Sequence, residues 1–303
     1  MTVYFQCPKP STPSGGVLFI HQIVQLLNEI GIKSFVWTPE PFEVWWSANP
    51  FLPEQIVKSI QPGHGDIVVI PEVGWPASEM NGAKQVLFVQ NYIWLNQEAF
   101  RNNPVDALVC SRFLANHMQR VFNASVVGKI TPFLYDDVWN PTPKEANRTL
   151  VFARRNPYHE KMRDALEADG FPVEYVTEQL TQRQVADLLK RCEFYVHLSH
   201  PEGFPIACLE AMRSGTIVVG TTGGGGNEFM LGKDETAVVV QDPENGRYGS
   251  SEEFINRIME EMNRLREDAG LRSRLWTQAL DWSKRYTAEA TKQELREIFG
   301  DGR

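Results

Sequence analysis

The stretch at residues 194–230 constrains the fold of this chain more than any other part of the sequence. It begins with an apolar run at 194–198, continues through Pro205, which suits the first position of a helix, and reaches Gly215, which suits a helix end. A second apolar run follows at 216–219. This order of strand, helix and strand predicts a parallel βαβ crossover, because parallel strands need a long connection.

Polar groups and glycines lie where this unit would bind a ligand. Glu202 and Glu210 lie between the two strands, and glycines occupy 223–226 after the second. Ligands bind beyond the carboxyl ends of strands in open α/β sheets, so one ligand can contact both acids. Glycines before a helix start at 227–230 predict exposed amides that bind phosphate, and a carboxylate at Glu210 suits two ribose hydroxyls. The predicted ligand is a nucleotide diphosphate joined to a polar group.

Simpler interpretations of the same residues remain open. Glu202 can be an ordinary loop acid and Glu210 an exposed helix residue. A glycine run is often a linker, but here it lies between an apolar strand and a helix start rather than between polar tracts.

The stretch resembles the retaining glycosyltransferases of family 4. These enzymes have an α/β fold called GT-B, in which two Rossmann-like, doubly wound domains face each other and a C-terminal helix crosses back to the first domain. The resemblance rests on Glu202-Gly203-Phe204, Glu210-Ala211-Met212, Gly215 and the glycine run with Glu228.

The resemblance implies a role for each matching position. Glu210 would bind the nucleoside ribose and Glu202 would approach the transferred sugar. The implied donor site also contains these residues: Gly203, Phe204, Gly223, Gly224, Gly225, Gly226 and Asn227.

A basic segment follows the strand expected at 149–153. Family members have an Arg and a Lys here that hold the diphosphate, and the matching residues are Arg154 or Arg155, together with Lys161. The sequence does not choose between the two arginines. A solvated basic turn is the alternative.

The first half of the chain alternates between strand-like and helix-like segments, as in a doubly wound sheet. Gly15 and Gly16 enter its first helix, where family members often carry paired glycines that face the donor, although a tight turn explains them equally well. Asn91 and Tyr92, after Gln90, occupy the place where many members have a histidine near the transferred sugar. A catalytic histidine therefore cannot be assigned, and we interpret His21, His64 and His117 as structural or surface residues.

An aromatic loop at 39–53 includes Trp45 and Trp46. Such a cluster can stack on an acceptor sugar, contact a membrane surface or form a satellite core. The sequence leaves these three alternatives open.

The expected organisation is an acceptor-side domain at 1–140, a donor domain at 149–285 and a terminal segment at 286–303 that packs back on the first domain. A proline-containing linker is expected at 132–148. Helices are predicted at 182–191, 252–267, 271–285 and 288–299 from their apolar periodicity.

Composition excludes some classes of function. A net charge of −8 at pH 7 argues against a nucleic-acid-binding surface. The four cysteines form no C-x-x-C pair and are interpreted as buried thiols of a reducing compartment. No leader peptide or membrane span is recognised, so we expect a cytoplasmic protein, with a peripheral contact at the inner face of the membrane left open.

The predicted function is retaining transfer of a hexose, such as mannose or glucose, from a UDP- or GDP-sugar to a hydroxyl of a saccharide or glycoconjugate. The sequence contains no Asp-x-Asp, so we expect no metal and no cofactor, with fixed cations stabilising the diphosphate. The alternatives are a non-catalytic nucleotide-sugar-binding subunit and a nucleotide-sugar epimerase or hydrolase on the same fold.

Overall fold

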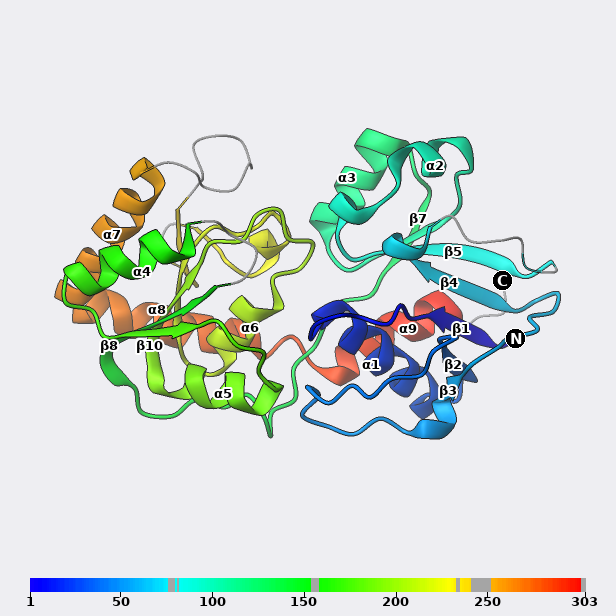
Figure 1. Cartoon of the computed structure of the whole chain (residues 1–303), viewed down its shortest axis with the longest axis horizontal. Coiled ribbons are helices and arrows are strands. Elements are labelled where there is room, and N and C mark those ends of the chain that lie inside the picture. Colours follow the sequence, from blue (N-terminus) through cyan, green and yellow to red (C-terminus); the bar gives the residue numbers. More distant parts are fainter. Residues whose placement is uncertain (76–79, 81, 154–157, 233–234, 241–251, 301–303) are drawn as a thin grey trace. The chain divides into compact units, whose positions relative to one another are not determined.

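The computed structural model describes residues 1–75, 80, 82–153, 158–232, 235–240 and 252–300 (Figure 1). The chain forms two compact units, each built on a parallel sheet. Unit 1 comprises Met1–Phe133 and Tyr286–Arg303, and unit 2 comprises Leu134–Arg285.

The sheet of unit 1 has its strands in the order β3-β2-β1-β4-β5-β6-β7. The strands are β1 (Val3–Gln6), β2 (Ser34–Trp37), β3 (Ile56–Val57), β4 (Ile67–Pro71), β5 (Lys84–Val89), β6 (Ala107–Val109) and β7 (Val126–Lys129). All paired strands run parallel, which fits their nearly continuous apolar sequences, because parallel sheets are covered on both faces.

The helices of unit 1 begin at side chains that accept backbone hydrogen bonds. They are α1 (Gly15–Glu29), α2 (Gln97–Asn102), α3 (Arg112–Phe122) and α9 (Ala288–Phe299), with single 3₁₀ turns η1 (Pro53–Gln55), η2 (Glu72–Gly74) and η3 (Tyr92–Trp94). Ser14 caps α1 by accepting from the amide of Val17, and Ser111 caps α3 in the same way. Each cap satisfies an amide that has no partner within its helix.

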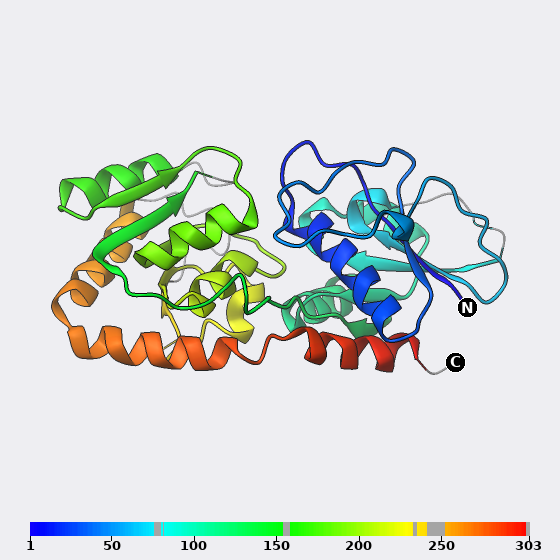
Figure 2. The ribbon, with the colours of Figure 1, turned by 90° about the horizontal axis from the view of Figure 1, so that it is seen from below.

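The C-terminal helix α9 belongs to unit 1, lies beside α1 and crosses the sheet on the same face (Figures 1 and 2). Phe299 packs its ring against Phe5 of β1, at 6.3 Å between centroids. Glu294 accepts hydrogen bonds from the amide and hydroxyl of Thr131, and Lys292 pairs with Glu29 of α1 at 2.9 Å. The last helix therefore completes the fold that begins with β1.

The sheet of unit 2 has the order β12-β11-β10-β8-β9 and is parallel throughout. Its strands are β8 (Glu145–Phe152), β9 (Val173–Val176), β10 (Cys192–His197), β11 (Ile217–Gly220) and β12 (Val238–Val239). The first of them begins earlier than the expected residue 149, inside the expected linker. Glu145 pairs with Cys192, across a shift in register from the pair of Thr149 with Phe194, so the neighbouring strand extends β8 backwards.

In the described part of unit 2, five helices cover the sheet, with α4 and α5 on opposite faces (Figure 1). They are α4 (His159–Ala168), α5 (Gln182–Arg191), α6 (Ile206–Arg213), α7 (Glu252–Glu267) and α8 (Ala269–Ser283). Three of the four helices whose bounds the sequence predicted, α5, α7 and α9, match them, whereas α8 is shifted by two residues. Pro205 precedes α6 as its N-cap rather than standing in the first turn, and Gly215 follows the helix with φ of +76°.

The core of unit 2 lies between the sheet and the helices α4, α7 and α8. Phe194 and Val196 of β10 point into it and are fully or almost fully buried. Successive residues of a strand face opposite sides, so Tyr195 and His197 face the other side of the sheet. No described helix is long and apolar enough to cross a membrane.

Candidate functional site

Two loops of unit 2 are joined beyond the carboxyl ends of β10 and β11. The amide of Glu202 donates to the carbonyl of Gly223 at 2.7 Å, and the amide of Gly225 donates to the carbonyl of Glu202 at 3.0 Å. These bonds form a parallel bridge between Glu202 and Gly224. The Glu202-Gly203-Phe204 segment and the glycine run are therefore one structure at the edge where α/β sheets bind ligands.

The glycines are needed because the two backbones nearly touch. A Cβ at position 225 would lie 2.0 Å from the carbonyl oxygen of Gly203, and one at position 223 would lie 2.7 Å from Cβ of Glu202. Gly223 and Gly224 also have φ of +63° and +94°. Side chains at these positions would force the loops apart.

The expectation of exposed glycine amides and a following helix is wrong. All four glycines at 223–226 are buried, and each amide donates to a protein oxygen: Thr221 Oγ1, Thr222 Oγ1, Glu202 O and Thr222 O. Only a single 3₁₀ turn, η4 (Gly225–Glu228), follows. Three of these amides bond within the glycine loop itself and that of Gly225 bonds to the other loop, so all four donors that the sequence pattern offers to a phosphate are already used.

Phe204 anchors the first loop. Its side chain is buried, and its ring lies 5.1 Å from that of Phe229, which follows η4. Gly203 beside it is also buried, whereas Asn227 is exposed. This apolar contact between Phe204 and Phe229 helps to hold the two loops together.

Glu210 is a buried acid on α6. The residue is 7% exposed, and burial raises the pKa of its carboxyl to about 8. Among the described residues, no hydrogen-bond donor or cation reaches this carboxylate. A buried carboxylate without a donor is costly, and such perturbed acids cluster at functional sites.

Glu202 and Glu210 both act electrostatically on Tyr195 and Cys208. Burial raises the pKa of Tyr195 and of Cys208 well above their ordinary values, and both glutamates add to each shift. Glu202 is half-buried, so its carboxyl is nearer to solvent than that of Glu210. Both acids therefore influence the same two side chains, of which Tyr195 lies on β10.

Sequence reasoning missed His197, the last residue of β10. It is buried, and its Nδ1 lies 2.7 Å from the carbonyl oxygen of Thr221. A carbonyl can only accept, so Nδ1 carries the proton, and burial lowers the pKa of the ring to about 4. The neutral His197 ring therefore links the end of β10 to Thr221, just before the glycine loop. In the sequence, the signal that could have identified it is a histidine at the end of an apolar strand.

The proposed cations are only partly described. Lys161 is exposed on α4, with its ammonium 6.0 Å from the centre of the Tyr158 ring. Arg154 and Arg155 lie outside the described residues. No group of three or more His, Cys, Asp or Glu side chains able to hold a metal occurs in the part of the chain that the structure describes.

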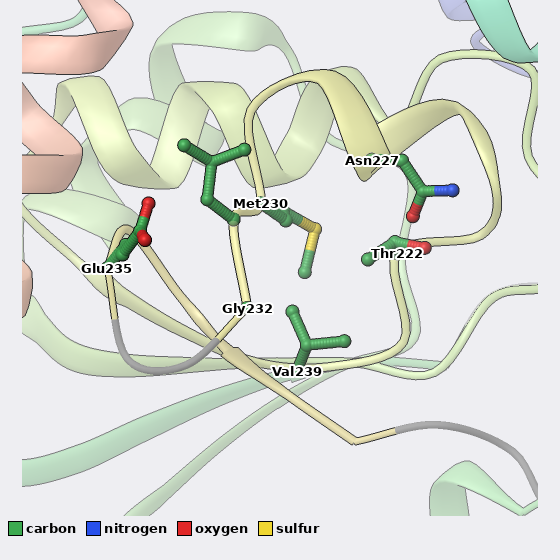
Figure 3. Close-up of a pocket in the computed structure, with 7 residues that line it drawn as sticks. Thr222, Asn227, Met230, Gly232, Glu235 and Val239 are labelled. Carbon is green, nitrogen blue, oxygen red and sulfur yellow. The ribbon is translucent and has the colours of Figure 1, made fainter.

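A pocket of about 480 Å³ opens beside the glycine loop (Figure 3). Thr222 and Asn227 line one end, and Glu235 lies at the other. Met230 and Val239 lie between them (Figure 3). Neither Glu202 nor Glu210 is among the residues that line it.

In unit 1 the two tryptophans differ. Trp46 is buried and donates Nε1 to the carbonyl of Ser14 at 3.3 Å, next to Gly15 and Gly16 at the start of α1. Trp45 is 46% exposed. The satellite-core interpretation therefore fits Trp46, while Trp45 keeps a free surface.

Asn91 and Tyr92 are held in place after β5. The side chain of Asn91 is buried and accepts from the amide of Ile93 at 3.4 Å. Tyr92 stacks on His117 at 3.9 Å between ring centres. One face of the Tyr92 ring is therefore covered.

Solved structures with the same architecture identify the fold as GT-B. A sucrose-phosphate synthase from Thermosynechococcus elongatus has a TM-score of 0.73 at 12% identity, covering 99% of this chain and 98% of that one. A glycosyltransferase from Rickettsia africae has a TM-score of 0.72 at 12% identity, with coverages of 99% and 98%. Anabaena HepE, in complex with UDP and glucose, has a TM-score of 0.66 at 15% identity, covering 99% of both chains.

Sequence comparison indicates the class of activity through a family match within unit 2. Residues 146–276 match the family of glycosyl transferases group 1. This match includes both loops, Glu202 and Glu210, and it supports glycosyl transfer as the class of activity. No curated protein is similar enough in sequence to be matched.

Proposed function

We propose that the protein is a retaining, metal-independent glycosyltransferase of family 4 that transfers a hexose from a nucleotide diphosphate sugar to a saccharide or glycoconjugate hydroxyl. The observation that carries this proposal is the buried carboxylate of Glu210, which has no donor among the described residues. Two ribose hydroxyls would supply the missing donors. Because the related fold of HepE holds UDP and glucose, UDP-glucose is the first donor to test.

Glu202 suits a different part of the donor. It is half-buried and fixed by two backbone hydrogen bonds to the glycine loop, so its carboxylate is presented from a rigid loop. We assign it to the transferred sugar. A group near the reacting ring can strengthen its contacts in the transition state, whereas a group at the ribose binds donor and product alike.

The diphosphate needs other partners than the glycine amides, which are already bonded within the protein. Lys161 is exposed and available, and we assign the anion to it together with Arg154 or Arg155. Fixed cations would stabilise the charge that develops as the glycosidic bond breaks. Retention of configuration rests on the family resemblance.

Four buried free thiols fit a reducing compartment, so we propose the cytoplasm as the location. The exposed Trp45 is the side chain that we assign to an acceptor or to the inner face of a membrane.

A non-catalytic nucleotide-sugar-binding subunit is the second candidate. Asn91 stands where many family members have a histidine, and its side-chain oxygen already accepts a backbone amide. Release of the sugar from UDP-glucose or GDP-mannose, followed by NMR, distinguishes the two candidates, since a binding subunit leaves the donor intact.

Calorimetry with UDP and GDP tests whether Glu210 binds the nucleotide. Glu210→Ala should weaken the binding of the preferred nucleotide by about 10- to 100-fold, because the two ribose hydroxyls lose their acceptor. Glu202→Ala should leave nucleotide affinity nearly unchanged but lower kcat with the intact donor. Glu167→Ala, on the exposed face of α4, is the matched control. Equal losses in the two site variants, or none in either, would refute the assignment.

A further inference from the structure

Three polar residues, Gln6, Glu72 and Gln90, lie at the carboxyl edge of the unit 1 sheet. The chain passes from β1 to β2 and β3 on one side and then returns to β4 on the other, so β1 and β4 flank the topological switch point. Crevices at such points bind ligands. Gln6 ends β1, Glu72 follows β4 and Gln90 follows the adjacent strand β5.

Glu72 acts as a clamp on the backbone after β5. The residue is 5% exposed. Its Oε1 accepts the amide of Asn91 at 2.8 Å, and its Oε2 accepts the amide of Gln90 at 3.1 Å. Each carboxyl oxygen thus holds one of two successive amides, which fixes the direction in which Gln90 and Asn91 leave the strand.

The clamp is costly for the protein. Burial raises the pKa of Glu72 to about 7, even though backbone hydrogen bonds from Gln90, Asn91 and Glu72 itself act in the opposite direction. Burying an ionisable side chain after a strand costs free energy that a neutral polar residue would not, although a neutral residue can also accept hydrogen bonds from backbone amides. The cost is explained if the position of Gln90 and Asn91 matters to a ligand.

Two glutamine side chains lie next to this clamp, each against a glycine. A Cβ at position 16 would lie 2.8 Å from Oε1 of Gln90, and one at position 74 would lie 2.7 Å from Oε1 of Gln6. Oε1 of Gln6 is buried and has no hydrogen-bond partner among the described residues. Leaving a buried acceptor unpaired costs about 1–3 kcal/mol, so the Gln6 amide gains free energy when its side chain meets a hydroxyl donor.

We propose that Glu72 is a positioning residue that holds Gln90 for the recognition of neutral sugar hydroxyls by the amides of Gln6 and Gln90. Carboxamides both donate and accept, as hydroxyls do, and carry no charge that would select a phosphate. This inference rests on the proposed function, because it assigns the sugar to the acceptor of the transfer reaction.

The kinetic test compares Glu72→Gln, Gln90→Ala and the double variant, with UDP-glucose as donor and glucose or mannose as acceptor. A glutamine at position 72 keeps one acceptor but turns an NH2 group toward the second amide. Each single variant should raise the acceptor KM by about 10-fold or more, as expected for a lost hydrogen bond. The double variant should lose no more than the worse single variant, since Glu72 acts through Gln90.

Controls separate positioning from general damage. UDP affinity should stay within twofold in both single variants, because the nucleotide is assigned to unit 2. Glu54→Gln, an exposed acid of unit 1, should change nothing. Losses that add in the double variant, or a loss of UDP affinity equal to the loss for the sugar, would overturn the proposal.

A binding measurement tests sugar recognition by Gln6 and Gln90 separately from the transfer reaction. In an NMR titration, glucose or mannose should shift the side-chain NH2 signals of Gln6 and Gln90, and glucose 6-phosphate should not be preferred. In Glu72→Gln the backbone amide signals of Gln90 and Asn91 should move and the sugar response should fall at least threefold. Sugar shifts without any turnover of UDP-glucose would count against the proposed function alone, whereas turnover without sugar shifts at the two glutamines would sink the inference.

Discussion

The guanidinium of Arg213 donates from Nε to the hydroxyl of Ser283 at 3.1 Å, and so joins the end of α6 to the end of α8. The same guanidinium also binds the carbonyl of Ser283 and the carboxylate of Asp136. Arg213 is 4% exposed, whereas the Asp136 side chain is 80% exposed. The helix that carries Glu210 is therefore fixed by a buried cation at its C-terminal end, three residues after Glu210.

Replacing Arg213 by Met should destabilise unit 2 by about 2–4 kcal/mol, because the hydroxyl and carbonyl of Ser283 lose a charged donor. Asp136→Ala should cost less than about 1 kcal/mol, since exposed ion pairs contribute little. Urea unfolding followed by fluorescence measures both. Similar shifts of the midpoint in the two variants would show that the ion pair, rather than Ser283, is the stabilising contact.

Gly225→Ala should disrupt the candidate donor site. Its Cβ would lie 2.0 Å from a backbone oxygen, which cannot move without separating the two loops. We expect a loss of at least about 2 kcal/mol in stability together with a loss of nucleotide binding. Gly232→Ala is the matched control, because nothing lies within 4 Å of its added carbon. Thermal unfolding and calorimetry with UDP check the pair, and tolerance of Ala at position 225 would contradict the described loop contact.

Stability should fall with rising pH through the titration of Glu210. Burial raises its pKa to about 8 from an ordinary value of 4.5, so the folded state holds a proton that the unfolded state has released. The contribution is complete below pH 4.5 and is lost as the pH rises through 8. Glu210→Gln should therefore be more stable than the parent protein at pH 9, by about 2–4 kcal/mol, and similar to it at pH 4.5.

Thermal unfolding between pH 4.5 and 9 measures this difference. Glu235→Gln, an exposed acid of the same unit, serves as the control and should follow the parent protein. A constant offset between Glu210→Gln and the parent across this range would mean that Glu210 is ionised throughout.

Transfer should proceed without a divalent metal. The sequence has no Asp-x-Asp, and the anion is assigned to Lys161 with Arg154 or Arg155. EDTA should leave the initial rate unchanged, whereas Lys161→Ala should lower it by about 10-fold or more through the loss of a charged contact. Activity abolished by EDTA and restored by Mn²⁺ would contradict the prediction. Lys190→Ala, also a helix lysine of unit 2, is a suitable control.

Local patterns predicted the elements that local interactions determine. The helix at 182–191 follows from its apolar periodicity, and its start is fixed by the reciprocal cap of Thr181 and Gln184, three residues apart. The βαβ unit around Glu202 and Glu210 was predictable for the same reason. Both acids are close in sequence, Glu202 on the loop before α6 and Glu210 on α6 itself.

Contacts between distant residues were not predictable. The glycine amides seemed available because nothing in the sequence shows that Gly225 meets Gly203, which lies on the preceding loop. Glu72 was missed because a single acid after a strand is usually solvated. Its burial and its two amide partners arise only when β4 and β5 pair.

The position of α9 has a consequence for the order in which the protein can fold during synthesis. The ring of Phe299 covers Phe5, and Ile298 fills the space above Gly128, which has no side chain of its own. At about 5–20 residues per second, the ribosome needs on the order of ten seconds to make the whole of unit 2 before these last contacts become available. Unit 2 can fold as soon as its own segment has emerged. Most of unit 1 is synthesised before unit 2, but its apolar contacts with α9 can form only after unit 2 has been made.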